Sequence, residues 1–303
     1  MSKSLLFSTR AYSYLKDELL LFESLESGSI MSKYFPDGEC YHRVESDVHK
    51  RHCVLIGGTI DDLNTMELYD IAQGLVQQGA ASLTIIIPYF GYATMERAVH
   101  AGEIVKAKNR ALLFSSIPPC EEANKVILLD LHSEGIPYYF DRDIRVAHVY
   151  CKPLIASIIL NLAPKGCVLA ATDAGRAKWV ESLAMDLHIP SAFVYKQRLS
   201  GSETQITGVN ADVRDKLVVI YDDMIRTGGS LMNAAKAYRE AGADQIYAIT
   251  THGLFTNHAL EKIAEQGIIQ KVYSTNTHPL AFNENNTILE VKSVASIIFA
   301  ALQ

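Results

Sequence analysis

Short apolar runs alternate with helical patterns along the chain, and this alternation constrains the fold more than any other feature. The apolar runs are His52–Ile56, Leu83–Tyr89, Lys125–Leu131, Cys167–Thr172, Ala192–Tyr195, Lys216–Tyr221, Gln245–Thr251 and Lys271–Ser274. Helical patterns at Asp62–Gln78, Glu103–Ser116, Arg176–His188 and Ser230–Ala241 separate several of them. Strands that are almost continuously apolar and separated by helices form parallel sheets covered on both faces. The sequence therefore predicts an α/β fold.

A weak internal repeat suggests two related domains. The run 54–59 precedes a helix, a Gly-Ala pair at 79–80 and another strand, and 218–229 precedes the same order with its Gly-Ala pair at 242–243. Two unrelated β-α-β units would also look this similar, so duplication stays one of two interpretations. We expect domains at 1–148 and 149–303, joined near residues 145–155, with the last helix as a candidate to pack back on the first domain.

Composition excludes several classes of protein. A net charge of -6 over 303 residues disfavours a general nucleic-acid binder, although a locally basic pocket remains compatible with it. No apolar stretch reaches the roughly 18 residues of a membrane span, so no membrane partner is expected. The cysteines are scattered, without a C-x-x-C pair, which favours neither a disulfide framework nor a zinc site. They are Cys40, Cys53, Cys120, Cys151 and Cys167. A reducing cytoplasm is the expected location.

The segment 218–230 carries the most specific chemistry. An apolar strand leads into Asp222 and Asp223, and the glycine loop, residues 226–230, leads into a helix that continues from Leu231. Two glycines let the backbone approach an anion closely, hydroxyls add donors, and the helix N-terminus contributes free N–H groups. The two acids, expected at the carboxyl end of the strand, suit sugar hydroxyls or a hydrated Mg²⁺. The combination favours a sugar phosphate over bare phosphate.

Two further strand ends carry polar residues, and one loop carries two cations. Asp130-Leu131-His132 and Thr172-Asp173 follow apolar runs, and ligands bind beyond the carboxyl ends of such strands. His132 by itself would more often be a core or capping histidine. Residues 197–215 are polar, with Lys196 and Arg198 at their start, and we interpret them as a surface hairpin or a mobile catalytic flap.

Six motifs in order resemble the ribose-phosphate pyrophosphokinase (phosphoribosyl diphosphate synthetase) family, from about residue 31 to the C-terminus. They are Phe35–Glu39, Pro88–Ala93, Asp130–His132, Thr172–Gly175, Lys196–Arg198 and Asp222–Ser230. The resemblance implies two related phosphoribosyltransferase-like domains, each a mainly parallel sheet flanked by helices. It also implies the family reaction, which is Mg²⁺-dependent transfer of diphosphate from ATP to O1 of ribose 5-phosphate, giving phosphoribosyl diphosphate and AMP for nucleotide biosynthesis.

The resemblance assigns roles to individual residues. Those implied to bind ribose 5-phosphate are Asp222, Asp223, Arg226, Thr227, Gly228, Gly229 and Ser230. His132 and Asp173 match the Mg²⁺ positions, and Lys196 and Arg198 match the catalytic cations. Those implied to bind ATP are Phe35, Asp37, Glu39 and Arg97. Because the loop at Phe35 reaches a neighbouring subunit's site in this family, the resemblance implies a homo-oligomer built from dimers, with a hexamer as one arrangement.

Departures from the family pattern leave alternatives open. Thr94 and Met95 replace an Arg-Gln pair, the basic stretch at 98–102 is lost, and Arg226 replaces a third acid. This version resembles the divergent plant-type branch, in which Arg97 would supply the missing cation. Two other functions remain as hypotheses: a phosphoribosyltransferase that uses the same loop, and a non-catalytic regulatory homologue of the synthetase. The second would explain the lost nucleotide contacts.

Overall fold

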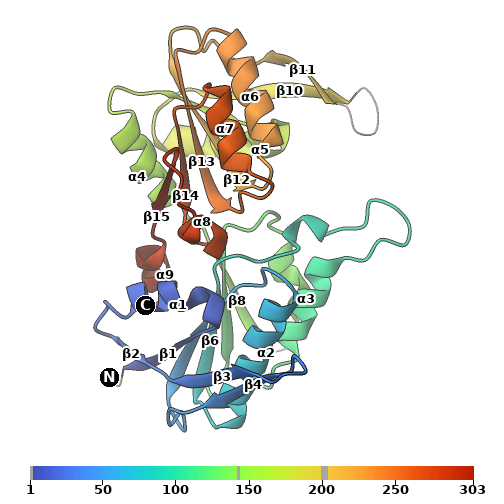
Figure 1. The fold of residues 1–303 in the computed structure, drawn as a ribbon, viewed down its shortest axis with the longest axis vertical. Coiled ribbons are helices and arrows are strands. Elements are labelled where there is room, and N and C mark those ends of the chain that lie inside the picture. The colour runs from blue at the N-terminus through green and yellow to red at the C-terminus, as the bar shows by residue number, and fades with distance from the viewer. Residues whose placement is uncertain (1–2, 142–143, 199–203) are drawn as a thin grey trace. The chain divides into compact units, whose positions relative to one another are not determined.

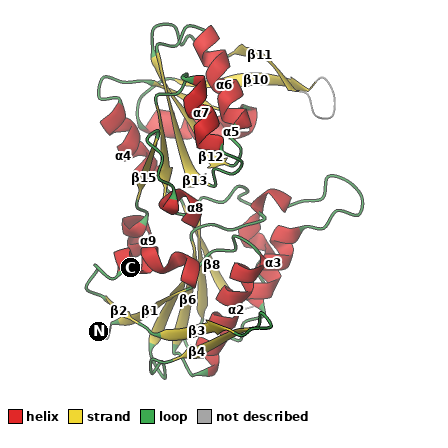
Figure 2. Ribbon diagram, viewed as in Figure 1, coloured by secondary structure: helices red, strands yellow, loops and turns green. Residues whose placement is uncertain are grey.

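The computed structural model describes residues 3–141, 144–198 and 204–303, and it describes only the backbone of residues 196–198 and 204–207. The chain forms two compact units, Met1–Tyr150 with Ala295–Gln303, and Cys151–Val294 (Figure 1). Each unit contains a mainly parallel sheet with helices packed against it (Figure 2). The α/β class predicted from the alternating runs is therefore confirmed.

The first unit is built on a six-stranded sheet in which all neighbouring strands are parallel. Its order is β2 (Leu25–Ser27), β1 (Ser4–Ser8), β5 (His52–Ile56), β6 (Ser82–Ile87), β7 (Asn124–Leu129) and β8 (Ile144–Val149). Its α-helices are α1 (Ser13–Leu19), α2 (Asp62–Gln77), α3 (Lys106–Ser115) and α9 (Ala295–Leu302). Short 3-10 helices span Arg10–Tyr12, Ala93–Met95 and Ile136–Tyr139. A separate antiparallel hairpin, β3 (Ile30–Tyr34) and β4 (Cys40–Val44), packs against α2.

The C-terminal helix α9 belongs to the first unit, although the second unit separates the two in sequence. The ring of Phe299 stacks on that of Phe22 with centroids 4.0 Å apart. The ammonium group of Lys125 donates a hydrogen bond of 3.0 Å to the carbonyl of Ala301. These contacts anchor the end of the chain on the first sheet and on the segment after α1.

The second unit is built on a seven-stranded sheet. Its order is β11 (Thr204–Val209), β10 (Ser191–Arg198), β9 (Val168–Ala171), β12 (Leu217–Ile225), β13 (Gln245–Gly253), β14 (Lys271–Thr275) and β15 (Leu289–Lys292). Only the pair of β10 and β11 is antiparallel among these described strands. Its helices are α4 (Lys152–Leu162), α5 (Ala174–Asp186), α6 (Gly229–Glu240), α7 (Ala259–Gln266) and α8 (Pro279–Asn283).

Aliphatic side chains of the central strands form the core of each unit. Leu55 and Ile85 in the first unit, and Val219 and Ile249 in the second, are completely buried. Burying one such side chain stabilises the fold by about 1.5–3 kcal/mol. Because both faces of these strands are covered, their sequences are continuously apolar, which is why they were recognisable.

All eight predicted strands and all four predicted helices are present, with ends displaced by a few residues. The short strands β1, β2, β3, β4, β8 and β15 were not predicted. The residues of β8 and β15 are only partly buried or exposed, so they lack a continuous apolar run. Residues 197–215 do form part of a hairpin, because β10 pairs with β11 in antiparallel register.

Each sheet has a switch point, where two adjacent strands send their following helices in opposite directions. In the first unit β1 continues to β2 on one side while β5 continues to β6 on the other. In the second unit β9 continues to β10, and β12 continues to β13. Ligands of open α/β sheets bind in the crevice at the carboxyl ends of such strands. We therefore expect ligand-binding sites at the two switch points.

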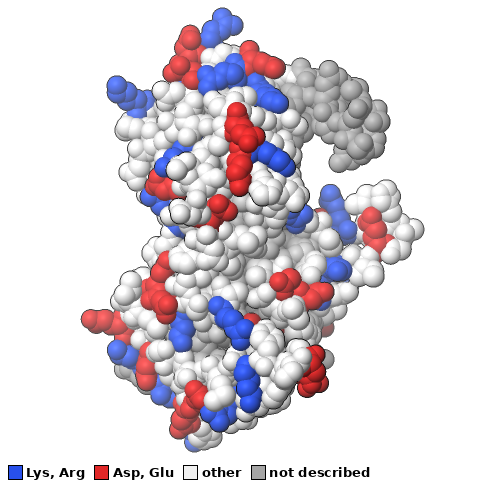
Figure 3. Space-filling view, viewed as in Figure 1, with Lys and Arg blue, Asp and Glu red and all other residues white. Residues whose placement is uncertain are grey.

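Acidic and basic side chains are interspersed on the face shown in Figure 3. This distribution accompanies the net charge of -6. Among the described residues, no helix has the length and apolar character needed to cross a membrane.

Candidate active site

The switch point of the second unit brings together two of the predicted motifs. Thr172 and Asp173 directly follow β9, and Asp222 and Asp223 lie on the adjacent strand β12. The glycine loop then connects β12 to α6. Thr172 and Asp222, which are 50 residues apart in sequence, thus meet at one edge of the sheet through a side-chain hydrogen bond.

The two acids do not lie at the end of their strand, which corrects the sequence prediction. Strand β12 continues to Ile225, because β13 supplies partners up to the pair of Ile225 and Gly253. On its other side, the ladder with β9 ends at the pair of Tyr221 and Ala171. The acids therefore project beyond the end of β9 while the backbone that carries them remains held by β13.

Asp222 is partly buried and held by its neighbours. Its Oδ2 accepts a hydrogen bond of 2.9 Å from the hydroxyl of Thr172, and its Oδ1 accepts one of 3.1 Å from the N–H of Asp223. Burial, together with the negative charge of Asp223, raises the pKa of Asp222 to about 7. Asp222 is thus poised between a neutral acid and a carboxylate near neutral pH.

Asp223 has a different environment from Asp222. It is 4% exposed, and its Oδ2 forms an ion pair with the guanidinium of Arg176 on α5. Sequence reasoning did not find Arg176. Arg176 could have been recognised as a candidate from its position three residues after Asp173, at the start of a predicted helix that follows a predicted strand.

The glycine loop has the backbone that the sequence prediction required. Gly228 has φ of 76°, a left-handed conformation that a residue with a Cβ rarely adopts. It occupies the N-cap position of α6, and within the described residues no side chain caps this helix. The carbonyl of Arg226 accepts a hydrogen bond of 2.9 Å from Thr256. Arg226, Thr227 and Ser230 are exposed, so the loop presents donors and the positive end of the helix dipole to solvent.

Asp173, the predicted Mg²⁺ ligand in this unit, is also the N-cap of α5. Its Oδ1 accepts a hydrogen bond of 2.9 Å from the N–H of Gly175. A capping carboxylate has a second oxygen, so this role is compatible with a metal ligand. The bond fixes the carboxylate in direction, which a metal site requires.

The other predicted metal residue, His132, follows β7 in the first unit and is exposed. The preceding residue, Leu131, donates its N–H to Nε2 of His148 at 2.9 Å. His148 is half-buried, which lowers the pKa of this imidazole and keeps its ring neutral as an acceptor. Sequence reasoning missed His148, which lies on β8 and positions the backbone beside His132. Among the described residues, no three His, Cys, Asp or Glu side chains form a ready-made metal cluster.

The segment Phe35–Glu39 is the turn of the β3–β4 hairpin. Gly38 has φ of 94°, and Oδ1 of Asp37 accepts a 3.1 Å hydrogen bond from the N–H of Glu39. The ring of Phe35 is 41% exposed, and the ammonium of Lys33 lies 4.9 Å from its centroid. The segment is therefore a tight turn, as its Pro-Asp-Gly sequence favours, and it also presents an aromatic face with a cation beside it.

The remaining predicted cationic residues are Arg97, Lys196 and Arg198. Arg97 lies in the exposed loop after β6, where its Nε is 3.5 Å from Oε1 of Glu96. Lys196 and Arg198 lie on β10, at a register shift between Tyr195 and Lys196. The side chains of Lys196 and Arg198 lie outside the part of the chain that the structure describes.

At the switch point of the first unit, described side chains fill the position that corresponds to the glycine loop. Its sequence there is Gly57-Gly58-Thr59. The hydroxyl of Tyr12 lies so close to Gly58 that a Cβ on this glycine would be 2.2 Å from it. The hydroxyl of Thr59 accepts a hydrogen bond of 2.7 Å from the N–H of Gly91. Protein groups thus fill the position that is open in the second unit.

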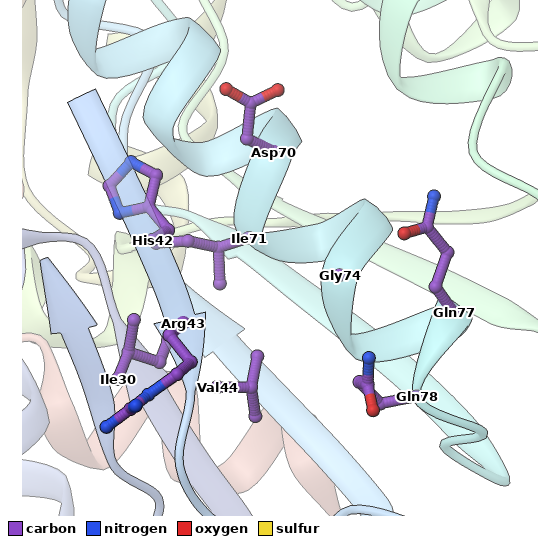
Figure 4. A pocket seen from close by; sticks show the side chains of 9 residues that line it. All are labelled: Ile30, His42, Arg43, Val44, Asp70, Ile71, Gly74, Gln77 and Gln78. Atoms are coloured by element: carbon purple, nitrogen blue, oxygen red, sulfur yellow. The ribbon is translucent and has the colours of Figure 1, made fainter. Parts of the chain in front are cut away.

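A separate cavity of about 390 Å³ lies between the β3–β4 hairpin and α2 (Figure 4). It is lined by Ile30, His42, Arg43, Val44, Asp70, Ile71, Gly74, Gln77 and Gln78. The predicted site residues are not among them.

Comparison with known proteins supplies independent information. Residues 4–117 match the family model of the N-terminal domain of ribose phosphate pyrophosphokinase, and residues 197–301 match that of the phosphoribosyl synthetase-associated domain. The chain is 34% identical to ribose-phosphate pyrophosphokinase 2, chloroplastic, of Spinacia oleracea, over 97% of this chain and 74% of the relative. It is 31% identical to ribose-phosphate pyrophosphokinase of Nostoc sp., over 97% of this chain and 88% of the relative.

A solved structure gives the same result for the fold. Phosphoribosylpyrophosphate synthetase from Mycobacterium smegmatis is 26% identical and superposes with a TM-score of 0.88. The match covers 99% of this chain and 98% of that protein.

Proposed function

The chain belongs to the ribose-phosphate pyrophosphokinase family, and we propose that it transfers diphosphate from ATP to O1 of ribose 5-phosphate, giving phosphoribosyl diphosphate and AMP. The observation that carries this proposal is the switch point of the second unit. There strand β12, which carries the partly buried Asp222, leads through the left-handed Gly228 into a helix N-terminus that no described side chain caps. An anion site next to hydroxyl acceptors is what a sugar phosphate needs.

The glycine loop would hold the 5-phosphate. Backbone N–H groups of residues 226–230 and the hydroxyls of Thr227 and Ser230 supply neutral donors. The exposed guanidinium of Arg226 adds a positive charge where the family pattern has an acid. The acids on β12 would receive the ribose hydroxyls, so the sugar is oriented by groups on a paired strand.

Magnesium fits the residue types of the two predicted ligands, which are His132 after β7 in the first unit and Asp173 after β9 in the second unit. Mg²⁺ in proteins uses one or two protein ligands and completes its shell with water and substrate phosphates. We assign His132 and Asp173 to this role, and the capping bond to Gly175 keeps the Asp173 carboxylate oriented. The ion would neutralise charge on the phosphates during transfer.

The nucleotide and its transfer need further groups. We assign Phe35, Asp37, Glu39 and Arg97 to ATP, with the exposed ring of Phe35 as the surface on which adenine stacks. Such a hairpin turn can serve a neighbouring copy of the chain, so we propose a homo-oligomer built from dimers. Lys196 and Arg198 would stabilise the negative charge of the migrating diphosphoryl group. We place the enzyme in the cytoplasm, in keeping with its free cysteines.

A regulatory, non-catalytic homologue is the second candidate. It is favoured by Thr94 and Met95, which lack the charge of the family's nucleotide contacts, and by Arg97, which is directed at Glu96. The unusual Arg226 in the glycine loop points the same way.

Product formation separates the two candidates. The purified chain is incubated with ATP and ribose 5-phosphate, with and without Mg²⁺, and AMP is quantified by chromatography. AMP that requires both ribose 5-phosphate and Mg²⁺, and that disappears in Asp222→Asn, supports the synthetase. If the folded wild type binds ribose 5-phosphate yet releases no AMP, it is not the active diphosphokinase.

A further inference from the structure

The backbone that follows β13 supports the glycine loop from behind. The carbonyl of Ile225 accepts hydrogen bonds of 2.9 and 3.1 Å from the N–H groups of residues 254 and 255. The carbonyl of Arg226 accepts one of 2.9 Å from the N–H of Thr256. We call residues 254–263, which continue from these donors into α7, the backing segment. Its first three residues thus hold the two carbonyls at the entrance of the glycine loop.

These hydrogen bonds fix the direction of a donor in the loop. In a trans peptide the C=O and N–H bonds point in opposite directions, so the N–H of Thr227 points away from the carbonyl of Arg226 and from the backing segment. This N–H has no hydrogen-bond partner among the residues that the structure describes, and Thr227 is exposed. The peptide therefore presents a donor to the solvent side, where a flipped carbonyl would repel an anion.

Phe255 gives the backing segment its turn. Its φ is 45°, a left-handed conformation that is unfavourable for a residue with a Cβ. Its side chain is buried and packs so closely on Gly253 that a Cβ on this glycine would overlap the ring. Because glycine would adopt the turn at position 255 more easily, burial of the phenylalanine ring is what offsets the unfavourable backbone.

Helix α7 covers the back of the loop at Gly228. Ala259 and Ile263 are four residues apart, lie on one side of the helix and are 0% and 1% exposed. A Cβ on Gly228 would lie 3.3 Å from Cδ1 of Ile263 and 3.8 Å from Cβ of Ala259. Glycine alone populates many conformations, so this packing restricts the backbone of the loop to the left-handed form.

We propose that the backing segment sets the anion-binding conformation of the glycine loop, with Phe255 and Ile263 as positioning residues for ribose 5-phosphate. This inference rests on the proposed function and refines it. Phe255 acts by holding the carbonyls that direct the loop, and Ile263 acts by packing on Gly228. A loop that already has its binding conformation loses less conformational freedom when the phosphate binds, and affinity increases accordingly.

The test uses a matched pair of truncations on α7. Ile263 and Leu260 have isomeric side chains and are both 1% exposed, but of the two only Ile263 supplies the atoms nearest to Gly228. By calorimetry without ATP, Ile263→Ala should weaken ribose 5-phosphate binding about tenfold, and Leu260→Ala should change it less than about threefold. Both variants lose buried apolar surface and should melt at lower temperature, so a loss of stability alone cannot separate them.

Two further variants and the kinetics test the positioning role. Phe255→Ala should also weaken ribose 5-phosphate binding about tenfold, because the left-handed backbone stays unfavourable while the buried ring is lost. Ile263→Val, which still covers Gly228, should bind within about threefold of wild type. In Ile263→Ala, KM for ribose 5-phosphate should rise about tenfold while kcat and KM for ATP stay within about threefold of wild type.

Equal ribose 5-phosphate binding in Ile263→Ala and Leu260→Ala overturns the inference, as does an equal rise of KM for both substrates. If Ile263→Ala does not fold, hydrogen–deuterium exchange of the wild type decides the question. Ribose 5-phosphate should then slow exchange in residues 253–257 as well as in the glycine loop, because the two backbones share hydrogen bonds. Protection confined to the glycine loop overturns the inference.

Failure of the proposed function would look different. A wild type that binds ribose 5-phosphate yet releases no AMP refutes the synthetase, while the calorimetric comparison still tests the backing segment. A wild type that binds no ribose 5-phosphate overturns both. An active wild type whose α7 variants bind equally well overturns the positioning role alone.

Discussion

Replacing Gly228 by alanine should disturb the glycine loop, whereas the same change at Gly229 should not. Gly228 has φ of 76°, and a Cβ there would lie 3.3 Å from Cδ1 of Ile263. Gly229 begins α6, and the nearest atom to its Cβ would be the hydroxyl oxygen of Thr227 at 3.9 Å. The two neighbouring positions thus form a matched pair that differs in backbone conformation.

The expected magnitude follows from the conformations. A non-glycine residue in the left-handed region costs roughly 1–2 kcal/mol, and Ile263 must also shift by a few tenths of an ångström. At Gly229 an alanine suits the helix and stabilises by up to about 1 kcal/mol, partly by reducing the freedom of the unfolded chain. The free energies of unfolding of the two variants should therefore differ by about 2 kcal/mol.

Urea denaturation followed by tryptophan fluorescence provides the assay, since the single tryptophan, Trp179, lies in the second unit. Calorimetric titration with ribose 5-phosphate should show weaker binding for Gly228→Ala, because the N–H groups of the loop are displaced from the 5-phosphate. Equal stability and equal binding in the two variants would refute the assignment of this loop conformation.

Three further predictions concern the chemistry. Lys196→Ala should lower kcat roughly a hundredfold or more while ribose 5-phosphate binding stays constant, and an unchanged kcat contradicts its catalytic role. Asp173→Asn should preserve the cap of α5 and hence the melting temperature. Both Asp173→Asn and His132→Ala should shift Mg²⁺ activation of the enzyme to higher Mg²⁺ concentration. Unshifted Mg²⁺ activation curves would exclude both residues as ligands. Because folding raises the pKa of Asp222 from 3.8 to about 7, its contribution to stability is present below pH 4 and is lost as pH approaches 7. Wild type should therefore lose stability relative to Asp222→Asn across this range, as urea midpoints at several pH values would show.

The family and the main elements of the fold were accessible from sequence because they depend on local patterns. Buried parallel strands such as β5 and β13 produce continuous apolar runs, and a left-handed loop before a helix selects glycines such as Gly228. These signals lie within a few residues of each other. Strands with partly exposed residues, such as β8, leave no such pattern and were missed.

The partners of each functional side chain could not be predicted in the same way. The sequence places Asp222 beside Asp223 and shows them as equals, because it does not show which distant side chains contact each of them. Their difference arises from Thr172 at the end of β9 and Arg176 on α5, about 50 residues earlier. Likewise the first unit carries a Gly-Gly-Thr segment after a strand, and only packing places Tyr12 against it and closes that position. Chemistry that depends on residue type and short spacing could be predicted from the sequence. The charge balance and solvent exposure of each functional side chain depend on contacts between distant segments, which only the tertiary structure provides.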